Sequence, residues 1–337
     1  MAAYTTIDDP EAYFQVEAYT GNGSDGRTIT LSADTDMQPD FVWIKNRDEE
    51  DAPCIFDSVR GANKYLQTSG TIGELDQPSS GYVSGFASDG FTVTSGSSGD
   101  DNVNKNTETY VAWCWKESAT SGFDILTYTG NATNRTIAHN LSAVPQVVIV
   151  KRTDATTAWS SLHLNGVGSE YRMVLNDSAA PEDDATMWQD TDPTSSVFTL
   201  GTSSSTNVNT GTYVAYCFAE KQGYSKFGNY TGNGNADGAF VYTGFRPAFV
   251  LFKQTNTSGG HWYIYDNKRG QNELDKHLYP NVTSAEATGD NSIDILSNGF
   301  KMRSNNGDSN ASGGTYIYMA FAEAPFVNSN GVPCNAR

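Results

Sequence analysis

The chain has 337 residues, of which 37% are hydrophobic and 12% aromatic, and its formal net charge is −18 at pH 7. This length exceeds that of a usual single domain, and the acidic balance disfavours nucleic acid and anionic membranes as partners because both would repel it. No segment approaches the roughly 20 apolar residues of a membrane span, and the N-terminal residues do not have the basic and apolar regions of a signal peptide. We therefore expect a soluble protein of several domains that is made in a cytoplasm, without membrane insertion.

In chain order, the first recurring element is the tetrapeptide YTGN, which is followed each time by the same landmarks. A proline leads into an apolar run that ends in lysine, a segment such as SDGFTV or SNGFKM follows, and a tyrosine-initiated apolar segment that ends in glutamate closes the unit. The copies of YTGN start at residues 19, 128 and 230, and the closing segments span residues 110–117, 213–220 and 316–323. A fixed order of landmarks that occurs three times indicates an internal triplication.

The closing segments predict the type of structure. In the first of them Val111, Trp113 and Trp115 alternate with Ala112 and Cys114, so that bulky residues lie on one face and small residues on the other. This alternation is typical of a β-strand that is buried on both faces, as a central strand is. Frequent Gly, Ser, Thr, Asn and Asp residues divide the rest of each unit into about seven short candidate strands.

We therefore predict an all-β protein made of three tandem antiparallel β-sandwich repeats that are jelly-roll-like. The expected boundaries are 1–118, 119–222 and 223–337, and the third repeat includes a C-terminal tail. Only short linkers separate the repeats, which predicts that they pack in a fixed relation. Their net charges are −13, −5 and 0, from 7 basic against 20 acidic residues, 5 against 10, and 9 against 9.

Each YTGN is expected to mark the end of the first strand of its repeat. The pattern places Gly21, Gly130 and Gly232 where the chain leaves that strand, and we expect them to supply a backbone shape that other residues resist. A repeated ligand-binding site at these loops is the alternative interpretation.

Candidate catalytic and metal-binding residues are few. The cysteines show no metal-ligand spacing, and Cys114 and Cys217 occupy a position where the third repeat has an alanine, which indicates a small buried site rather than a disulfide. The histidines do not recur between repeats, so structural roles are expected for them. Carboxylate runs at 48–51, 100–101 and 182–184 are interpreted as solvated loops, with calcium coordination as the alternative. We expect no catalytic residues and no cofactor.

One charged motif occurs in the first and third repeats. An aromatic residue and an aspartate are followed three residues later by Arg-Gly, which gives the pairs Asp57 with Arg60 and Asp266 with Arg269. The second repeat reads HLNGVGSEY in this place and has neither charge. We expect each pair to form a local ion pair that holds a turn. Contact with a sugar or with a neighbouring subunit is the alternative.

Several long phrases resemble a family of repeat-containing virion proteins from marine bacteriophages, often described as tail-fibre-like. They include TIDDPEAYFQVEAYTGNGS, PDFVWIKNRDEEDAPCIFDSVRGANKYL and GTYIYMAFAEAPFVNSNGVPCNAR, and the resemblance covers essentially the whole chain. It implies a structural protein of a phage particle and no catalytic residue. The expected location is then the virion, with other virion proteins and further copies of the chain as partners, and with a host glycan as a possible ligand.

Three other functions are compatible with the sequence. The chain could be a capsid decoration protein instead of a tail appendage. It could also be a carbohydrate-binding module in which exposed Trp159, Trp188 and Trp262 stack on sugars, although each of these residues could equally belong to the core. A depolymerase of host glycan, with loop carboxylates such as Asp183 or Asp184 as catalytic groups, is the enzymatic alternative.

Overall fold

The computed structural model of the protein describes residues 3–97, 101–270 and 273–334, and this part of the chain is nearly all β. The helical segments are single turns: η1 (Pro10–Ala12), α1 (Ala185–Trp188), α2 (Ser204–Asn207) and α3 (Gly307–Asn310). Among the described residues, no helix is long and apolar enough to cross a membrane. The predicted all-β class is confirmed.

The strands fall into three successive groups, here called the first, second and third unit. The first contains β1 (Phe14–Thr20), β2 (Arg27–Thr30), β3 (Phe41–Asn46), β4 (Cys54–Asp57), β5 (Lys64–Gln67), β6 (Leu75–Asp76), β7 (Tyr82–Ala87), β8 (Gly90–Thr94) and β9 (Thr109–Trp115). The second contains β10 (Phe123–Thr129), β11 (Arg135–Ala138), β12 (Pro145–Arg152), β13 (Ser160–His163), β14 (Tyr171–Val174), β15 (Glu182–Asp183), β16 (Val197–Leu200) and β17 (Thr212–Ala219). The third contains β18 (Ser225–Thr231), β19 (Phe240–Tyr242), β20 (Phe245–Gln254), β21 (Trp262–Asp266), β22 (Glu273–His277), β23 (Ala287–Leu296), β24 (Gly299–Met302) and β25 (Thr315–Pro325).

Each unit consists of an inner and an outer antiparallel sheet. The inner sheets have the orders β1-β9-β3-β4-β5-β6, β10-β17-β12-β13-β14-β15 and β18-β25-β20-β21. The outer sheets are β2-β8-β7, β11-β16 and β19-β24-β23-β22. In the third unit the strand β22 belongs to the outer sheet, and a single bridge between Ile264 and Leu278 connects this region to β21. Otherwise the inner sheets repeat the same strand order.

The closing strand lies inside each inner sheet, as predicted. Strand β9 pairs with β1 on one side and with β3 on the other. The small residues Ala112 and Cys114 face the core between the two sheets of their own unit. The bulky residues Val111, Trp113 and Trp115 face the other way, into a core to which all three units contribute. The small residues of the closing strand therefore belong to the core inside their own unit, and the bulky residues belong to the core that the three units share.

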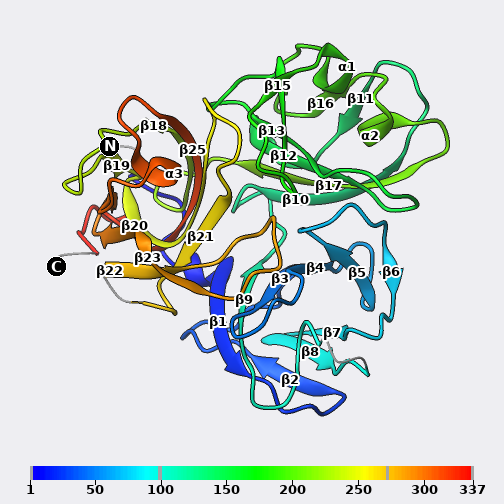
Figure 1. Ribbon diagram of the computed structural model, residues 1–337, viewed down its shortest axis with the longest axis horizontal. Helices are drawn as coiled ribbons and strands as arrows, with labels where there is room; N and C mark the ends of the chain where they lie inside the picture. Colours follow the sequence, from blue (N-terminus) through cyan, green and yellow to red (C-terminus); the bar gives the residue numbers. More distant parts are fainter. Residues whose placement is uncertain (1–2, 98–100, 271–272, 335–337) are drawn as a thin grey trace.

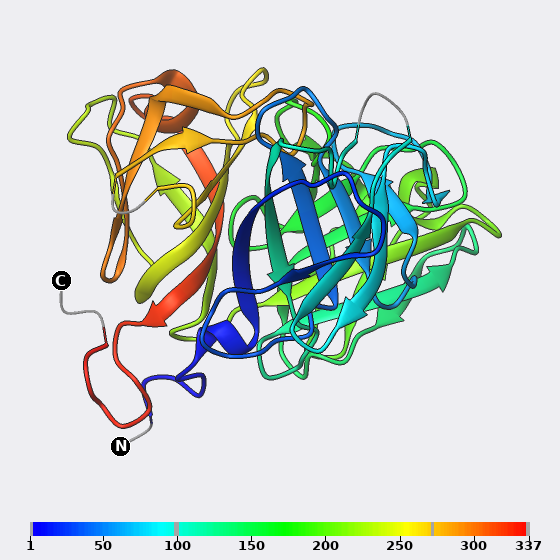
Figure 2. The same cartoon turned by 90° about the horizontal axis from the view of Figure 1, so that it is seen from below.

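The shared core joins the three units into one body. At its centre, the equivalent residues Trp115, Phe218 and Phe321 contact one another, with ring centroids 5.3 to 6.5 Å apart. Figure 1 shows the three units as lobes around this centre, and Figure 2 shows the same body from the side. Large aromatic side chains dominate the burial of apolar surface, so the centre is a main source of stability.

The two ends of the described chain lie close together beside the third unit (Figures 1 and 2). Near the N-terminus, the hydroxyl of Tyr4 donates a hydrogen bond to Gly244 O at 2.8 Å. The backbone N–H of Ser329 donates to the carboxylate of Asp8 at 2.6 Å. Both ends of the chain are thus attached to the same lobe.

Candidate functional site

The YTGN loops are held by contacts inside each unit. In the first copy, the ring of Tyr19 stacks on the closing Tyr110 with centroids 5.3 Å apart, and its hydroxyl donates to Val103 O at 2.8 Å. The backbone N–H of Asn22 donates to Oδ1 of buried Asn104, whose Nδ2 donates back to Asn22 Oδ1. The tyrosine stacking recurs in the pairs Tyr128 with Tyr213 and Tyr230 with Tyr316, and both asparagine bonds recur between Asn233 and Asn310. In the second copy the Asn131 N–H donates to Asn207 Oδ1, whereas Asn207 Nδ2 donates to Thr133 O and Gly201 O. YTGN therefore ties the end of the first strand to the loop before the closing strand.

The glycine of each YTGN is required for a reason other than the expected one. Gly21 does not have the left-handed backbone conformation that favours glycine, and neither do Gly130 and Gly232. Instead, a Cβ added to them would lie 2.0 Å from Lys105 O, 2.2 Å from Val208 O and 2.3 Å from Ala311 O, respectively. A close approach of two backbone segments, rather than an unusual backbone shape, excludes other residues.

Both predicted ion pairs are present. Arg60 Nε lies 2.5 Å from Asp57 Oδ2, and Arg269 Nε lies 2.6 Å from Asp266 Oδ2. The backbone N–H of each arginine also donates to the second oxygen of its aspartate, at 2.8 and 3.0 Å. All four side chains are almost fully buried. The prediction that these pairs hold a turn is confirmed.

The same aspartates also connect one unit to the next, which the sequence analysis missed. The hydroxyl of Tyr216, on the closing strand of the second unit, donates to Asp57 of the first unit at 2.7 Å. The indole Nε1 of Trp113, on the closing strand of the first unit, donates to Asp266 of the third unit at 2.9 Å. The sequence holds one signal for this link: Trp113 and Tyr216, both of which can donate a hydrogen bond, occupy equivalent positions of their closing segments.

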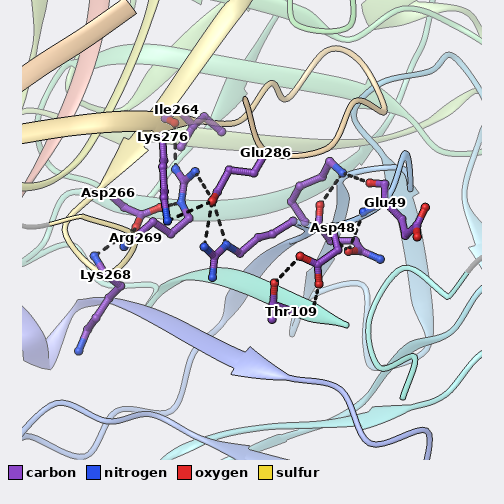
Figure 3. Close-up of polar contacts among 12 residues, drawn as sticks. Asp48, Glu49, Thr109, Ile264, Asp266, Lys268, Arg269, Lys276 and Glu286 are labelled. Carbon is purple, nitrogen blue, oxygen red and sulfur yellow. Dashed lines mark hydrogen bonds and ion pairs between the residues drawn. The ribbon is translucent and has the colours of Figure 1, made fainter. Parts of the chain in front are cut away.

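At the junction of the third and first units, a glutamate extends this network. Glu286, just before β23, lies 3.1 Å from Arg269 Nη1 and 2.9 Å from Nε of Arg47, which follows β3 of the first unit. Figure 3 shows the side chain of Glu286 beside those of Arg269 and Lys276, and Lys276 Nζ lies 4.0 Å from Glu286 Oε1. Burial alone would raise the pKa of Glu286, but the hydrogen bond from Arg47 and the charges of both arginines lower it. The backbone N–H of Glu286 donates to Arg47 O at 2.8 Å.

The junction of the first and second units has an equivalent network. Glu74, just before β6, lies 3.1 Å from Arg60 Nη1 and 3.7 Å from Lys64 Nζ. Its backbone N–H donates to Thr153 O of the second unit at 2.7 Å. These two places, where an acid–arginine–glutamate network crosses from one unit to the next, are called the charged junctions below.

The junction of the second and third units is built from different residues at the same places. His163 ends β13 as Asp57 ends β4, and Gly166 follows it three residues later, where Arg60 follows Asp57. Tyr171 starts β14 as Lys64 starts β5, and Pro181 precedes β15 as Glu74 precedes β6. On the closing strand of the third unit, the position equivalent to Trp113 and Tyr216 is occupied by Met319, which cannot donate a hydrogen bond. His163 is buried, and desolvation lowers its pKa to about 3. We call this place the open junction.

A cleft of about 490 Å³ lies at the open junction. The second unit contributes Gly166, Val167, Tyr171 and Pro181, and the third unit contributes Asn229, Tyr230, Thr231, Thr255, Asn256 and Thr315. These positions include those where the charged junctions have arginine, lysine and glutamate. The proline also lacks the N–H with which Glu74 and Glu286 each bond to the neighbouring unit. We therefore attribute the cleft to the absence of the charged network here.

The cleft combines one exposed aromatic side chain with neutral polar groups. Tyr171 is 38% exposed. Asn256 Oδ1 accepts hydrogen bonds from the Thr315 N–H at 3.1 Å and from a glutamine side chain at 3.2 Å. The amide nitrogen of Asn256 carries two further N–H donors. Thr255 and Thr315 are linked through their hydroxyls at 2.8 Å. The ten described lining residues contain no carboxylate, imidazole, thiol or amine.

The three lysines that end the recurring Pro-to-Lys runs are buried, which the sequence did not predict. Lys151 Nζ donates to Thr71 O of the first unit at 3.0 Å, and Lys253 Nζ donates to Ser178 O of the second unit at 3.1 Å. Lys45 donates within its own unit to Glu49 O at 3.1 Å. Desolvation lowers the pKa of each of them to about 8. They hold loops together through backbone carbonyls.

The tryptophans considered for sugar stacking are buried. Trp159 is 0% exposed, Trp188 2% and Trp262 1%, so none presents a ring face to a ligand. Trp159 Nε1 donates to Gln67 O of the first unit at 2.8 Å, and Trp262 Nε1 donates to Val174 O of the second at 3.1 Å. The expectation of exposed stacking residues is wrong for these three, two of which link neighbouring units instead.

Contrary to the expectation, the carboxylate runs are not all solvated loops: Asp51 and Asp101 are buried, and Glu182–Asp183 form the exposed strand β15. Asp48 accepts hydrogen bonds from the N–H and hydroxyl of Thr109, and Asp184 caps the short helix α1. Asp101 accepts from the Asn104 N–H at 2.9 Å, whereas its neighbour Asp100 lies outside the described residues. Among the residues that the structure describes, no group of three or more His, Cys, Asp or Glu side chains is arranged to hold a metal ion. The described cysteines are free thiols.

The comparisons with known proteins give a family. No curated protein matches the sequence. A family model described as Domain of unknown function (DUF7483) matches residues 9–325, a range that includes parts of all three units and every junction between them. The family is thus defined by the whole three-lobed body and not by one repeat. The protein is a member of the DUF7483 family.

Proposed function

We propose that the protein is a structural component on the surface of a bacteriophage particle, most simply a tail appendage that contacts the host. The observation that carries the proposal is the shared core, in which one residue of each closing strand meets its two equivalents. Three units fused in this way form a single rigid block. A rigid block that presents surface loops suits a particle component. The phrases that resemble tail-fibre-like virion proteins support the same function.

The use of the buried charged groups also supports a structural role rather than an enzymatic one. Asp57 and Asp266 each bind an arginine of their own unit and a hydrogen-bond donor of the next unit. The buried lysines bind backbone carbonyls. These groups therefore act in holding the body together, and we assign no catalytic step to them.

We further propose that the third unit docks onto the particle and that the first unit faces solvent. The third unit has no net charge, whereas the first carries −13. On β19 of the third unit, Phe240 and Tyr242 lie on the same face of the strand and are 49% and 53% exposed. Exposed aromatic side chains at a neutral surface are typical of protein contacts.

The location is tested by immunogold labelling of purified virions with an antibody to this chain. Gold at the tail supports the tail appendage, and gold over the head supports the decoration protein. Unlabelled virions from a lysate that contains the protein would contradict any particle role.

The docking orientation is tested by complementation with a variant that carries Phe240→Ser and Tyr242→Ser. We expect this variant to fold and to be lost from particles, because both side chains are exposed. A pair of serines at the exposed Val59 and Leu75 of the first unit serves as the control and should be incorporated normally. Truncation of the third unit is unsuitable, because it would remove a third of the shared core.

A further inference from the structure

We infer that the cleft at the open junction is a binding site for a neutral saccharide. This inference goes beyond the proposed particle role and does not depend on it, because binding is a property of the isolated chain. It rests on the size of the cleft, on the exposed ring of Tyr171 and on the uncharged polar groups around it.

The size of the cleft suits a small ligand. Its volume of about 490 Å³ lies within the range of roughly 300–1,000 Å³ that is typical of small-molecule sites. It lies between two units, which is a common place for such sites. Because the shared core fixes both units, the two walls are held in place before any ligand binds. Preorganised walls reduce the entropic cost of binding.

The chemistry of the walls matches the two kinds of surface that a sugar presents. The exposed ring of Tyr171, with Val167 and Pro181 beside it, can pack against the C–H face of a pyranose ring. Opposite them, Asn256 offers amide N–H donors, and Thr255 and Thr315 offer hydroxyls that donate and accept. Sugar hydroxyls both donate and accept, so they can pair with either kind of group.

The charge pattern selects a neutral saccharide over charged ligands. An anionic sugar would need a basic group, and the described lining residues contain none. The overall charge of −18 would also repel it. A cationic ligand would need a carboxylate or a cage of aromatic rings, whereas the lining offers two tyrosines, one of them buried, and no carboxylate. The two charged junctions fill the same places with ion pairs.

The other two units indicate which substitutions the fold accepts. The position of Tyr171 is occupied by Lys64 in the first unit, and that of Pro181 by Glu74. A variant with both Tyr171→Lys and Pro181→Glu therefore introduces residues that the same architecture already carries elsewhere. It places an ion pair in the cleft without disturbing the shared core.

The experiment measures binding of the full chain to an array of neutral oligosaccharides built from hexoses and N-acetylhexosamines, with sialylated, uronate-bearing and sulfated oligosaccharides as the charged set. The strongest neutral probe is then titrated by calorimetry at millimolar concentration. We expect binding to neutral probes only. Tyr171→Ala should weaken it at least about tenfold, and the Tyr171→Lys, Pro181→Glu double variant should abolish it.

Val144→Ala is the matched control, because Val144 belongs to the same unit as Tyr171, is 37% exposed and does not line the cleft. It should bind as the wild type does, and circular dichroism checks that every variant is folded. The inference is overturned if no neutral probe binds, if only charged probes bind, or if binding survives in the folded double variant. None of these outcomes bears on the particle location, which the gold labelling decides separately.

Discussion

The charged junctions and the open junction join neighbouring units through different contacts at equivalent positions. At each charged junction a buried aspartate holds an arginine of its own unit and accepts a hydrogen bond from the closing strand of the next unit. At the open junction the equivalent residues are His163 and, on the closing strand of the third unit, Met319, and the surrounding positions hold glycine, tyrosine and proline. The comparison shows that two units can join without the buried aspartate–arginine pair, through the shared apolar core and hydrogen bonds such as those that Trp262 and Lys253 donate to the second unit.

This difference also suggests why the three units are no longer identical. Each charged junction buries an aspartate that is paired with an arginine. Substituting either residue lowers stability strongly, because the other is then left as an unpaired buried charge. A junction without such a charge can accept substitutions at its rim with little effect on stability. A binding site is therefore most easily acquired at the open junction.

The largest expected effect comes from breaking a charged junction. Asp57→Ala leaves Arg60 buried without its partner and removes the acceptor of the Tyr216 hydroxyl. We expect the free energy of unfolding, measured by urea denaturation, to fall by about 3–5 kcal/mol. His163→Ala changes the same position at the open junction and should cost about 1–2 kcal/mol, since no charge is left unpaired. Equal losses in the two variants would show that the ion pair has no special role.

A smaller effect is expected when only the link between units is removed. Tyr216→Phe deletes the hydroxyl that donates to Asp57 but keeps the ring in the shared core. The expected loss in the free energy of unfolding is about 1.5–3 kcal/mol, as for other hydrogen bonds to charged groups. Tyr224→Phe is the control, because its hydroxyl is buried and has no hydrogen-bond partner among the described residues. That variant should be at least as stable as the wild type, and a loss as large as that of Tyr216→Phe would contradict this account.

The sequence predicted the elements better than their assembly. Alternation of large and small residues was enough to place the closing strand at the centre of its sheet, because such a pattern requires burial on both faces. It could not show that the bulky face of Trp113 and Trp115 packs against other units, since a pattern along one strand does not identify what covers it. The Asp57–Arg60 pair is local and was predictable. Its bond to Tyr216, which is distant in sequence, was not.

The candidate site was not predictable for a related reason. The tryptophans were considered as ligand contacts because of their residue type, yet Trp159 and Trp262 are part of the shared core. The cleft lies where the second unit lacks the charged residues of the other two units. In the sequence HLNGVGSEY, the absence of the aspartate and the arginine does not by itself predict a cleft. Only the positions of Tyr171 and Pro181 beside the third unit make the cleft visible.

A pH effect separates the junctions further. Desolvation lowers the pKa of His163 from 6.5 to about 3 in the folded protein. Its neutral form therefore contributes stability that is fully present above pH 6.5 and is lost as the pH falls toward 3. Between pH 6.5 and 5.5 the wild type should lose about 1 kcal/mol more than His163→Leu, because the histidine of the unfolded chain goes from half to almost fully protonated. Urea denaturation of both proteins at the two pH values measures this difference, and parallel pH profiles would show that His163 does not titrate as assigned.

The smallest expected effect comes from making the open junction resemble the charged ones. The Tyr171→Lys, Pro181→Glu double variant introduces an ion pair at the rim and restores a backbone N–H at the position from which Glu74 donates to Thr153 O in the first unit. An exposed ion pair contributes about 0.2–1 kcal/mol, and a backbone hydrogen bond about 0.5–1.5 kcal/mol, part of which offsets the loss of the rigid proline. We expect a net gain of about 0.5–1 kcal/mol in urea denaturation, with Tyr171→Lys alone as the control. A gain would mean that the open junction is kept at a cost in stability, as a binding site would be. A loss greater than about 1 kcal/mol would mean that Tyr171 and Pro181 stabilise the junction by their own packing, and their retention would then need no ligand to explain it.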